Sequence, residues 1–366
     1  MKLLIVTSNY PRWHGDTTTP FVHNFAKQLV ENGHTVRVLA PHYKGAKTNE
    51  MYDGVEIKRF RYLLPESAQT VCYQGGALGN LAKNKVNKLK LPMLVVCEFL
   101  AVLKQLLFWK PDVVNSHWLL PQGFVCALAA SITGTKHVAT VHGGDVFALN
   151  SPLMCKLKAF SINQATLITV NSSVTEAKVK ELAPNTTTPL LRLPTGILPT
   201  PELDKTKVNS LRKSLQKAEN EKLIIFVGRL SEEKGVREAI LATQKLLQND
   251  KKVRLIIIGE GHEKSELQTL VKELKIELYV NFLGWVENKE IYFFFAACDV
   301  FVGPSKQSKD GWVEAQGLTF AEAMLAGCPV IGSSSGGIPD SIRPDETGWL
   351  CKPENHNDLK HSRQFL

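Results

Sequence analysis

The sequence predicts an α/β protein made of two Rossmann-like units, each with a parallel sheet covered by helices. Two observations support this class. Short apolar runs rich in β-branched residues alternate along the chain with loops and with segments of helical spacing. The 366 residues exceed one ordinary domain, and 44% hydrophobic with 22% charged residues is typical of a globular protein. We therefore expect two hydrophobic cores.

The apolar runs form two series. The first comprises Leu3–Val6, Val36–Ala40, Val55–Ile57, Val113–Val114, Val138–Val141 and Leu167–Val170. The second comprises Leu223–Val227, Leu255–Ile258, Val280–Phe282, Val300–Val302 and Val330–Ile331. The turn-rich stretch Pro194–Pro201 lies between them and is the expected linker. We expect an N-terminal domain over residues 1–198 and a C-terminal domain over residues 199–366.

Composition excludes several classes. The seven cysteines are scattered without a Cys-x-x-Cys pair, which indicates core residues in a reducing compartment and neither a disulfide framework nor a zinc site. The N-terminal apolar run ends before Pro11, too soon for a signal sequence, so we expect a cytoplasmic protein. The net charge of +9 suits a nucleotide, an acidic membrane face or a nucleic acid. We expect no nucleic acid, because no basic-aromatic recognition motif is present.

Residues 81–110 combine a basic lead-in with an apolar segment. The lysines Lys83, Lys85, Lys88 and Lys90 precede the sequence MLVVCEFLAVLKQLLFW. Glu98 and Lys104 interrupt the apolar part, so it should not span a bilayer. Two interpretations stay open: a helix that lies on an anionic leaflet, or a core helix preceded by a solvated loop.

Two glutamates, Glu314 and Glu322, border a predicted helix near the C-terminal end. Thr319 is a natural N-cap and Glu322 follows three residues later, as in a capping box. The pattern predicts a helix from near Thr319 to Ala326, with Gly327 as its stop. The N-terminus of this helix would favour a phosphate. Alone, the same residues also fit a capped surface helix.

Glycines around the neighbouring strand ends favour a binding site. They are Gly317, Gly327, Gly332, Gly336 and Gly337, and they indicate places where the backbone approaches something closely. The whole motif, Glu-x7-Glu followed by Ala-Met-x-x-Gly-x-Pro-Val-Ile and Gly-Gly-Ile-Pro, resembles the signature of the family 4 retaining glycosyltransferases of GT-B fold. The resemblance implies two Rossmann-like domains facing across a cleft, the first binding the acceptor and the second a nucleotide sugar.

The resemblance also implies roles for the residues of this motif. In that family the second glutamate, here Glu322, holds the ribose hydroxyls of the nucleotide sugar. The first, here Glu314, faces the transferred sugar. The backbone amides of Gly317, Leu318 and Thr319 meet the phosphates and the sugar.

In the N-terminal domain, Gly15 lies between the first strand and a helix expected from near Pro20, an arrangement that brings backbone N–H groups to an anion. An isolated glycine also simply serves a turn. The resemblance implies that Gly15 approaches the donor diphosphate, although Asp16 stands where relatives often have a second glycine.

The sequence His142-Gly143-Gly144-Asp145 follows a strand at its carboxyl end, where open α/β sheets bind ligands. It is similar to a family turn whose histidine lies beside the transferred sugar. We therefore expect His142 to contact the sugar and not to act as a base. Asp145 would meet the acceptor or cap the following helix.

In the C-terminal domain, Arg229 and Lys234 follow a strand and precede a helix, so both reach an anion at the strand's carboxyl end. They also fit a solvated basic pair. They match the family's Gly-Arg-x-x-x-x-Lys-Gly motif, in which the charges oppose the diphosphate.

Two further loops of this domain resemble the family's base pocket. The first is the glycine turn Gly259-Glu260-Gly261 after an apolar strand, and the second contains Trp285 and Val286. A lone Gly-x-Gly is weak by itself. The resemblance therefore implies that Gly259, Gly261, Trp285 and Val286 belong to the donor site.

Together these features predict a retaining glycosyltransferase, with Arg229, Lys234, Glu314 and His142 at the reaction centre. It would use no cofactor and no metal, because no Asp-x-Asp motif stands at a strand end. The acceptor would be a saccharide or a lipid-linked saccharide, as in exopolysaccharide assembly, taken up in the cytoplasm or at the inner face of the plasma membrane. The alternatives are a nucleotide-sugar epimerase on the same fold and a catalytically silent nucleotide-sugar or membrane-binding module.

The end of the chain differs from the expected pattern. Gly348–Pro353 resembles the family's Thr-Gly-x-Leu-x-x-Pro strand, after which relatives usually continue with helices that cross back to the first domain. Asn357-Asp358-Leu359 would begin the first of these, and the remaining residues have no apolar repeat to complete it. We therefore expect a chain truncated before its crossover helices.

Overall fold

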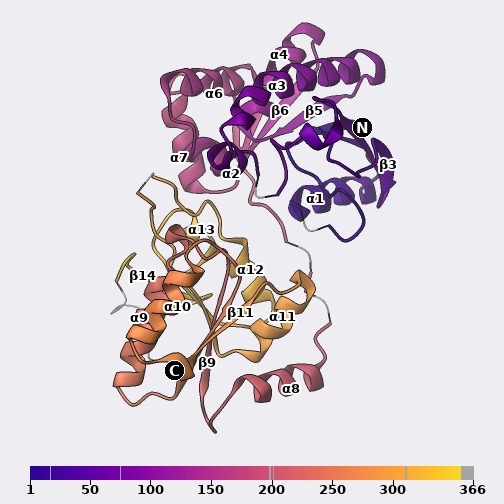
Figure 1. Ribbon diagram of the computed structural model, residues 1–366. Helices are drawn as coiled ribbons and strands as arrows, with labels where there is room; N and C mark the ends of the chain where they lie inside the picture. The colour runs from indigo at the N-terminus through magenta and orange to yellow at the C-terminus, as the bar shows by residue number, and fades with distance from the viewer. Residues whose placement is uncertain (17, 75, 198, 201, 310, 356–366) are drawn as a thin grey trace. The chain divides into compact units, whose positions relative to one another are not determined.

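The computed structural model describes residues 1–16, 18–74, 76–197, 199–200, 202–309 and 311–355 (Figure 1). The chain divides into two compact units, Met1–Gly196 and Ile197–Leu366. The division falls inside the turn-rich stretch Pro194–Pro201. The helix expected from Asn357 lies outside the described residues.

The first unit contains an eight-stranded sheet. Its order is β3 (Asn49–Tyr52), β4 (Val55–Phe60), β2 (Thr35–Pro41), β1 (Lys2–Val6), β5 (Val113–His117), β6 (Lys136–Val141), β7 (Leu167–Val170) and β8 (Leu190–Arg192). All neighbours are parallel except β3, which pairs with β4 in the antiparallel direction. The predicted parallel sheet is thus confirmed for the strands that the sequence identified.

The two edge strands β3 and β8 were not predicted. Strand β3 has the sequence NEMY, in which exposed and half-buried positions alternate. It therefore contains no apolar run. It forms because Asp53 and Gly54, both with positive φ, make a tight hairpin turn back into β4. Strand β8 has three residues and is mostly exposed. Both strands depend on pairing with a neighbour that the sequence pattern does not reveal.

Helices cover both faces of the first sheet. They are α1 (Pro20–Glu31), α2 (Gly76–Lys83), α3 (Val86–Lys104) with its π-helical extension η2 (Gln105–Trp109), α4 (Phe124–Thr133), α5 (Gly144–Phe147), α6 (Pro152–Gln164) and α7 (Ser173–Leu182), with short turns η1 (Glu66–Ala68) and η3 (Leu119–Gly123). On one face α1 packs against Ile5 and Val38. On the other, α3 and α4 pack against Leu4 and Val6, because neighbouring strand residues point to opposite faces.

The second unit contains a six-stranded, wholly parallel sheet. Its order is β11 (Val280–Gly284), β10 (Val253–Ile258), β9 (Lys222–Val227), β12 (Val300–Gly303), β13 (Val330–Ser333) and β14 (Trp349–Cys351). This is the doubly wound order, in which the direction of strand addition reverses between β9 and β12. Ligands of open α/β sheets bind at the carboxyl ends of such a pair.

Helices also cover both faces of the second sheet. They are α8 (Lys205–Leu215), α9 (Val236–Gln248), α10 (Lys264–Glu273), α11 (Asn288–Ala297), α12 (Leu318–Leu325) and α13 (Ile338–Ser341), with short turns η4 (Glu232–Lys234) and η5 (Glu277–Tyr279). Figure 1 shows α9 and α10 on one side of the strands and α11 and α12 on the other, in agreement with two separate apolar clusters.

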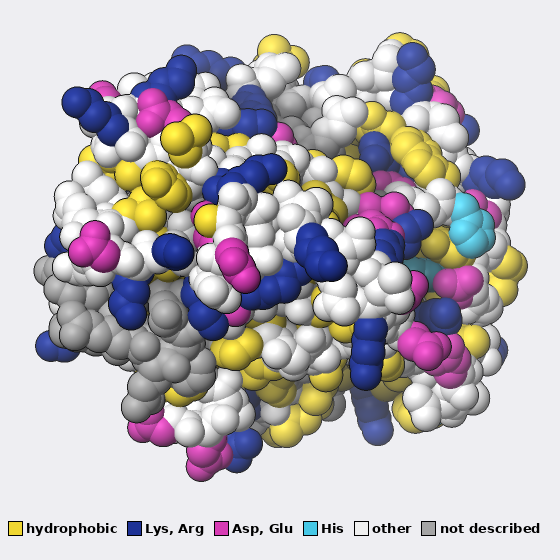
Figure 2. Space-filling view, turned by 90° about the horizontal axis from the view of Figure 1, so that it is seen from below, with side chains coloured by type: hydrophobic (Ala, Val, Ile, Leu, Met, Phe, Trp, Pro, Cys, Tyr) yellow, Lys and Arg dark blue, Asp and Glu magenta, His cyan; other side chains and the backbone are white. Residues whose placement is uncertain are grey.

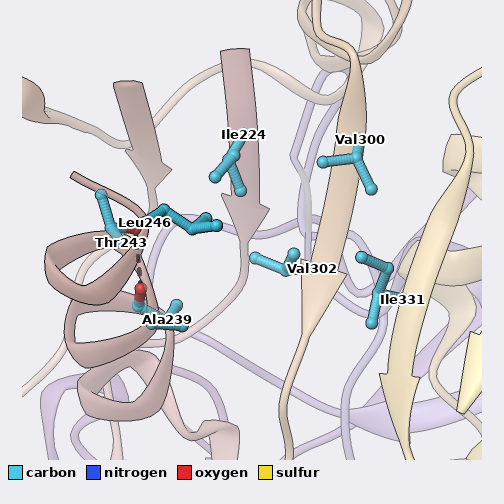
Figure 3. A pocket seen from close by; sticks show the side chains of 8 residues that line it. Ile224, Ala239, Thr243, Leu246, Val300, Val302 and Ile331 are labelled. Atoms are coloured by element: carbon cyan, nitrogen blue, oxygen red, sulfur yellow. Dashed lines mark hydrogen bonds between the residues drawn. The ribbon is translucent and has the colours of Figure 1, made fainter. Parts of the chain in front are cut away.

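A small cavity of about 20 Å³ lies between α9 and strands β9, β12 and β13 (Figure 3). Its lining is apolar except for Thr243, whose hydroxyl donates to the carbonyl oxygen of Ala239. No side chain there offers a free polar group to a ligand. The cavity is therefore a packing defect of the core and not a substrate site.

The predicted N-cap of α12 is wrong. The helix begins at Leu318, its N-cap is Gly317 in the left-handed region, and no side chain caps it. Thr319 lies inside the first turn, because the chain enters the helix with a φ of 75° at Gly317, which Thr does not readily adopt. The predicted stop is confirmed: Gly327 has positive φ and donates to the carbonyl of Met324.

Candidate functional site

An ion pair stands at the carboxyl edge of the second sheet. Lys234, at the end of the loop after β9, donates to the carboxylate of Glu314, which lies on the approach to α12. The side chains of both residues are mostly buried, at 21% and 14% exposure. Burial alone would raise the pKa of the Glu314 carboxyl, but the charge and hydrogen bond of Lys234 and the Gly317 amide lower it. Glu314 is therefore ionised at neutral pH.

Arg229 lies in the same loop with a very different exposure. Its side chain is 68% exposed, and the guanidinium lies 3.3 Å from Glu233, its one polar partner among the described residues. Glu233 is itself held by the hydroxyl of Ser231. Arg229 thus remains available to an anion, whereas Lys234 must exchange Glu314 for such a ligand.

The first turn of α12 adds neutral donors. The Gly317 amide donates to Glu314 Oε1 at 3.3 Å. The amides of Leu318 and Thr319 make no hydrogen bond within the described part of the chain. Two free N–H groups at a helix N-terminus suit an anion.

Glu322 is half-buried in α12, and no hydrogen bond or ion pair to its carboxylate is found among the described residues. Burial raises the pKa of this carboxyl. A buried acid without a partner costs stability, so its place in the fold is not explained by packing. The carboxylate can accept hydrogen bonds from ligand hydroxyls.

The glycines of this edge are required by the protein's own contacts. A Cβ at Gly259 or Gly261 would lie 1.8 Å or 2.0 Å from a carbonyl oxygen of the loop after β9. A Cβ at Gly317 or Gly332 would collide with the side chain of Phe320 or its neighbours. At these four glycines, the close approach is therefore to another loop or to a side chain of the protein itself. These contacts fix the loops that carry Arg229 and the start of α12.

Trp285 and Val286 follow the edge strand β11. The indole of Trp285 is 63% exposed, whereas Val286 packs on the core cluster beneath α11. An exposed aromatic ring at the carboxyl end of a strand is suited to stack on a flat ligand group.

In the first unit, His142 lies at the carboxyl end of β6 against three rings. They belong to Phe21 of α1 and to His117 and Trp118 at the end of β5, with centroids 5.0–5.2 Å from His142. His142 Nε2 is 2.9 Å from His117 Nδ1. Burial lowers the pKa of His142 to about 4, so the ring is neutral at physiological pH. A neutral ring supports the expected contact role and not a base poised near pH 7.

Asp145 is satisfied by the backbone. Its carboxylate accepts from the amides of Leu119, His142 and Gly143 at 3.0–3.2 Å. It therefore joins the loops after β5 and β6. This is a third role beside the two that the sequence left open, since the carboxylate faces no free surface and the N-cap at the start of α5 is Gly143.

Gly15 has a positive φ in an exposed turn closed by the Asp16 amide and the Trp13 carbonyl. A Cβ there would meet nothing within 4 Å. Helix α1 begins at Pro20, as predicted. The turn alone explains the glycine, and its contact with a diphosphate remains a prediction.

Comparison with known proteins assigns the chain to a family. The family model described as "Glycosyl transferases group 1" matches residues 207–364, and "Glycosyltransferase Family 4" matches residues 19–197. The chain belongs to this family of glycosyltransferases.

Relatives of this glycosyltransferase are similar to it over different shares of their length. N-acetyl-alpha-D-glucosaminyl L-malate synthase of Bacillus anthracis is 30% identical over 66% of this chain and 61% of its own. A glycosyltransferase of Methanocaldococcus jannaschii is 27% identical over 98% and 87%. The putative colanic acid biosynthesis glycosyltransferase WcaL of Escherichia coli is 36% identical over 36% and 32%. The chain thus spans less than two thirds of the first and third of these relatives.

Solved structures share the fold. Anabaena Alr3699/HepE in complex with UDP and glucose has a TM-score of 0.71 at 20% identity, covering 99% of this chain and 88% of its own. Sucrose-phosphate synthase from Thermosynechococcus elongatus has a TM-score of 0.73 at 18% identity, covering 100% and 89%. The two Rossmann-like units of this glycosyltransferase have the GT-B fold.

Sequence patterns did not identify two residues that the structure brings to these sites. His117 contacts His142, and Trp312 lies under the Lys234 ammonium at 5.8 Å. His117 stands at the carboxyl end of a strand, as His142 does, and this position could have identified it from the sequence. Trp312 stands two residues before Glu314, and no sequence pattern marks it.

The Lys234–Glu314 pair predicts a pH dependence of stability. Because the folded pKa of Glu314 is lowered, the pair stabilises the protein above the unfolded pKa, about 4.3, and this is lost as pH falls through the folded value. In Lys234→Met the buried carboxyl lacks its cation, so its pKa should rise. Urea unfolding between about pH 7 and pH 3 should show the stability gap between wild type and variant narrowing as pH falls. A gap that stays constant would rule out a coupled pair.

Proposed function

We propose that this glycosyltransferase moves a sugar from a nucleoside diphosphate sugar to a hydroxyl of a saccharide or lipid-linked saccharide, with retention of configuration and without a metal ion. The observation that carries the proposal is the carboxyl edge of the second sheet. There Lys234, the exposed Arg229 and the free amides of Leu318 and Thr319 provide positive charge and donors for a diphosphate.

The donor class is supported by both chemistry and relatives. Glu322 supplies an unpaired carboxylate for the hydroxyls of a ribose, and Trp285 supplies an exposed ring for a base. HepE has been solved with UDP-glucose, and a starch synthase of the same fold with ADP. A UDP- or ADP-sugar is therefore the first donor to test.

Charge neutralisation would take the place of a metal. Negative charge grows on the leaving diphosphate as the sugar bond breaks, and Arg229 and Lys234 lie where they can oppose it. Glu314 is ionised and engaged by Lys234 and the Gly317 amide, an arrangement that positions it and does not prepare it as a free nucleophile. We propose front-face attack by the acceptor, with the leaving phosphate taking the acceptor proton. His142 would bind a hydroxyl of the transferred sugar.

Labelled nucleotide sugars test the proposal against its alternatives. Incubation with a panel of UDP-, GDP- and ADP-sugars and a saccharide acceptor should give a new glycoside whose anomeric configuration, measured by NMR, equals that of the donor. Epimerised donor would indicate an epimerase, and unchanged donor with tight nucleotide binding a silent module. An inverted product, or activity abolished by a chelator, would contradict retention or metal independence respectively.

We propose a cytoplasmic location, with an anionic membrane face as a partner. The partner is supported by the exposed apolar face of α3 and η2. Their exposed apolar residues recur at helical spacing and are Val86, Leu89, Met93, Val96, Leu100, Leu107 and Phe108, with Leu89 and Phe108 at 82% and 80% exposure. The opposite face of the same helix packs into the core through Leu94 and Val102. One face of this helix therefore belongs to the core, and we propose that the other lies on an anionic leaflet.

Length alone does not decide how this helix meets a membrane. Val86–Trp109 is the one described segment that is long and apolar enough to cross a bilayer, a test that core helices of soluble proteins also pass. If the helix crossed the bilayer, Leu94 and Val102 would lose their contacts with the core. A helix that lies in the plane of the leaflet keeps these contacts and is therefore favoured.

The charges along the helix complement an anionic leaflet. Exposed lysines are Lys83, Lys85, Lys88, Lys104 and Lys110. The one acid between residues 85 and 110 is Glu98, which is fully buried and bonded to Gln122. Each lysine at such a surface contributes about 1 kcal/mol to membrane binding.

The face drawn in Figure 2 differs from this helix. Its Lys and Arg side chains alternate with acidic and apolar ones, so this face offers no continuous basic surface for a nucleic acid.

Flotation with vesicles tests the membrane face. Leu89→Ser, Val96→Ser and Leu100→Ser together should abolish co-flotation with vesicles that contain an anionic phospholipid, because they remove the apolar stripe and leave the core face intact. Charge reversal to Glu at Lys83, Lys85, Lys88 and Lys104 should do the same. Lys90 is left unchanged because its ammonium bonds Ala68 and Thr70.

The matched control changes exposed leucines elsewhere, Leu153→Ser and Leu278→Ser, and should float like wild type. Equal flotation of stripe variant and control would exclude the membrane face. If wild type is a dimer and the variant with Leu89, Val96 and Leu100 replaced is a monomer, the exposed apolar face of α3 is instead an interface between copies of this chain.

A further inference from the structure

We infer that His117 is a positioning residue that fixes His142 with its proton on Nδ1, so that His142 presents an N–H donor to a ligand oxygen. No motif of the sequence assigns a role to His117, a residue that is 2% exposed. The inference depends on the proposed function for the identity of the ligand as a sugar. The tautomer itself is a property of the protein alone.

The contact between the two rings is specific. His117 Nδ1 and His142 Nε2 are 2.9 Å apart, and the rings are nearly parallel, with an interplanar angle of 20°. Burial lowers the pKa of both imidazoles, and the neighbouring His142 ring lowers the pKa of His117 further. Two neutral imidazoles share one proton across this bond, so one ring donates and the other accepts.

The surroundings of His117 select the donor. Its other nitrogen, Nε2, is buried and has no hydrogen-bond partner in the part of the chain that the structure describes. If His142 donated, His117 would carry its proton on that nitrogen, as an orphaned buried N–H. If His117 donates from Nδ1, the orphan is a lone pair instead, and buried unpaired N–H groups are the rarer of the two in proteins. His117 therefore donates, and His142 accepts at Nε2.

This assignment leaves His142 with an Nδ1–H group. That nitrogen makes no hydrogen bond to any residue that the structure describes, and the ring is only half-buried. The free group is thus a donor, complementary to a hydroxyl oxygen. It does not suit proton abstraction, because the basic nitrogen is occupied by His117.

The loops around the pair are built to hold it. Trp118, whose ring contacts His142, has a φ of 74°, unusual for a bulky residue. Its amide donates to the carbonyl of Thr140 and its carbonyl accepts from the amide of Gly123. Asp145 ties the Leu119 amide to the His142 amide. This backbone holds the rings of His117 and Trp118 against His142, which is consistent with a site where ring orientation matters.

The experiment is NMR of protein labelled with ¹⁵N-histidine, in which long-range couplings identify the protonated nitrogen of His142, assigned by its loss in His142→Gln. Wild type should show Nδ1–H. His117→Asn, whose amide can replace the Nδ1–H donor, should keep it. His117→Leu removes the donor and should shift the proton population toward Nε2–H. The control His137→Gln alters a buried histidine that bonds Ser116 and should change nothing at His142.

Kinetics then connect the tautomer to transfer. Loss of one hydrogen bond to the sugar should lower kcat about tenfold in His117→Leu. His117→Asn should restore it, and nucleotide affinity should be equal in all variants because the nucleotide site lies in the other unit. A wild-type Nε2–H tautomer, or an unchanged tautomer in His117→Leu, would overturn the inference. If wild type transfers no sugar while the tautomers behave as expected, the proposed function fails and the positioning role stands.

Discussion

Replacement of Lys234 or Arg229 by alanine should lower turnover about 100-fold or more, while a chelator leaves the wild-type rate unchanged. Each variant removes a positive charge from the place where the leaving diphosphate becomes more negative. Lys234→Ala should have the larger effect, because it also leaves the buried Glu314 carboxylate without its cation and disturbs the approach to α12. Arg229→Ala should leave stability almost unchanged, since that side chain is exposed.

Steady-state kinetics with the donor identified from the panel give the measurement. Lys207→Ala is the matched control: Lys207 is also paired, with Glu290, in the same unit, but lies on α8. Its rate should equal that of wild type. Strict dependence on added magnesium or manganese, or full activity of Lys234→Ala, would refute charge neutralisation by these residues.

Glu322→Gln should weaken nucleotide binding about 10- to 100-fold, because charge-assisted hydrogen bonds to the ribose are each worth about 1.5–3 kcal/mol. The structure sharpens this prediction. Glu322 caps nothing, and burial raises its pKa, so its ionised form destabilises the folded protein at neutral pH. Removal of the charge should therefore leave Tm equal or raise it, where loss of a capping residue would lower stability by about 1 kcal/mol.

Calorimetric titration of UDP and ADP and a thermal melt of the same samples provide both readouts. Glu266→Gln, an exposed acid in the first turn of α10, is the control for nucleotide affinity and should leave that affinity unchanged. A folded Glu322→Gln variant with wild-type nucleotide affinity would remove Glu322 from the site.

The sequence by itself determined the two α/β units and the loops that carry the chemistry. Strands β1, β9 and β12 are read from apolar runs because buried parallel strands need them along their whole length. Arg229, Lys234 and His142 follow strand ends. The topology of open sheets places such residues at the carboxyl edge of the sheet to which each belongs. These are local patterns, so no distant contact is needed to recognise them.

Tertiary contacts decided the rest. The N-cap of α12 is Gly317 and not Thr319, because the chain turns there against the ring of Phe320, a contact that no capping pattern contains. The exposed face of α3 and the bond between His117 and His142 depend on which side of a helix or strand end meets a neighbour far away in sequence. Sequence periodicity predicts that one face of α3 is apolar and that a histidine stands at the end of a strand. Only the packing of the folded chain determines which residues that face and that histidine contact.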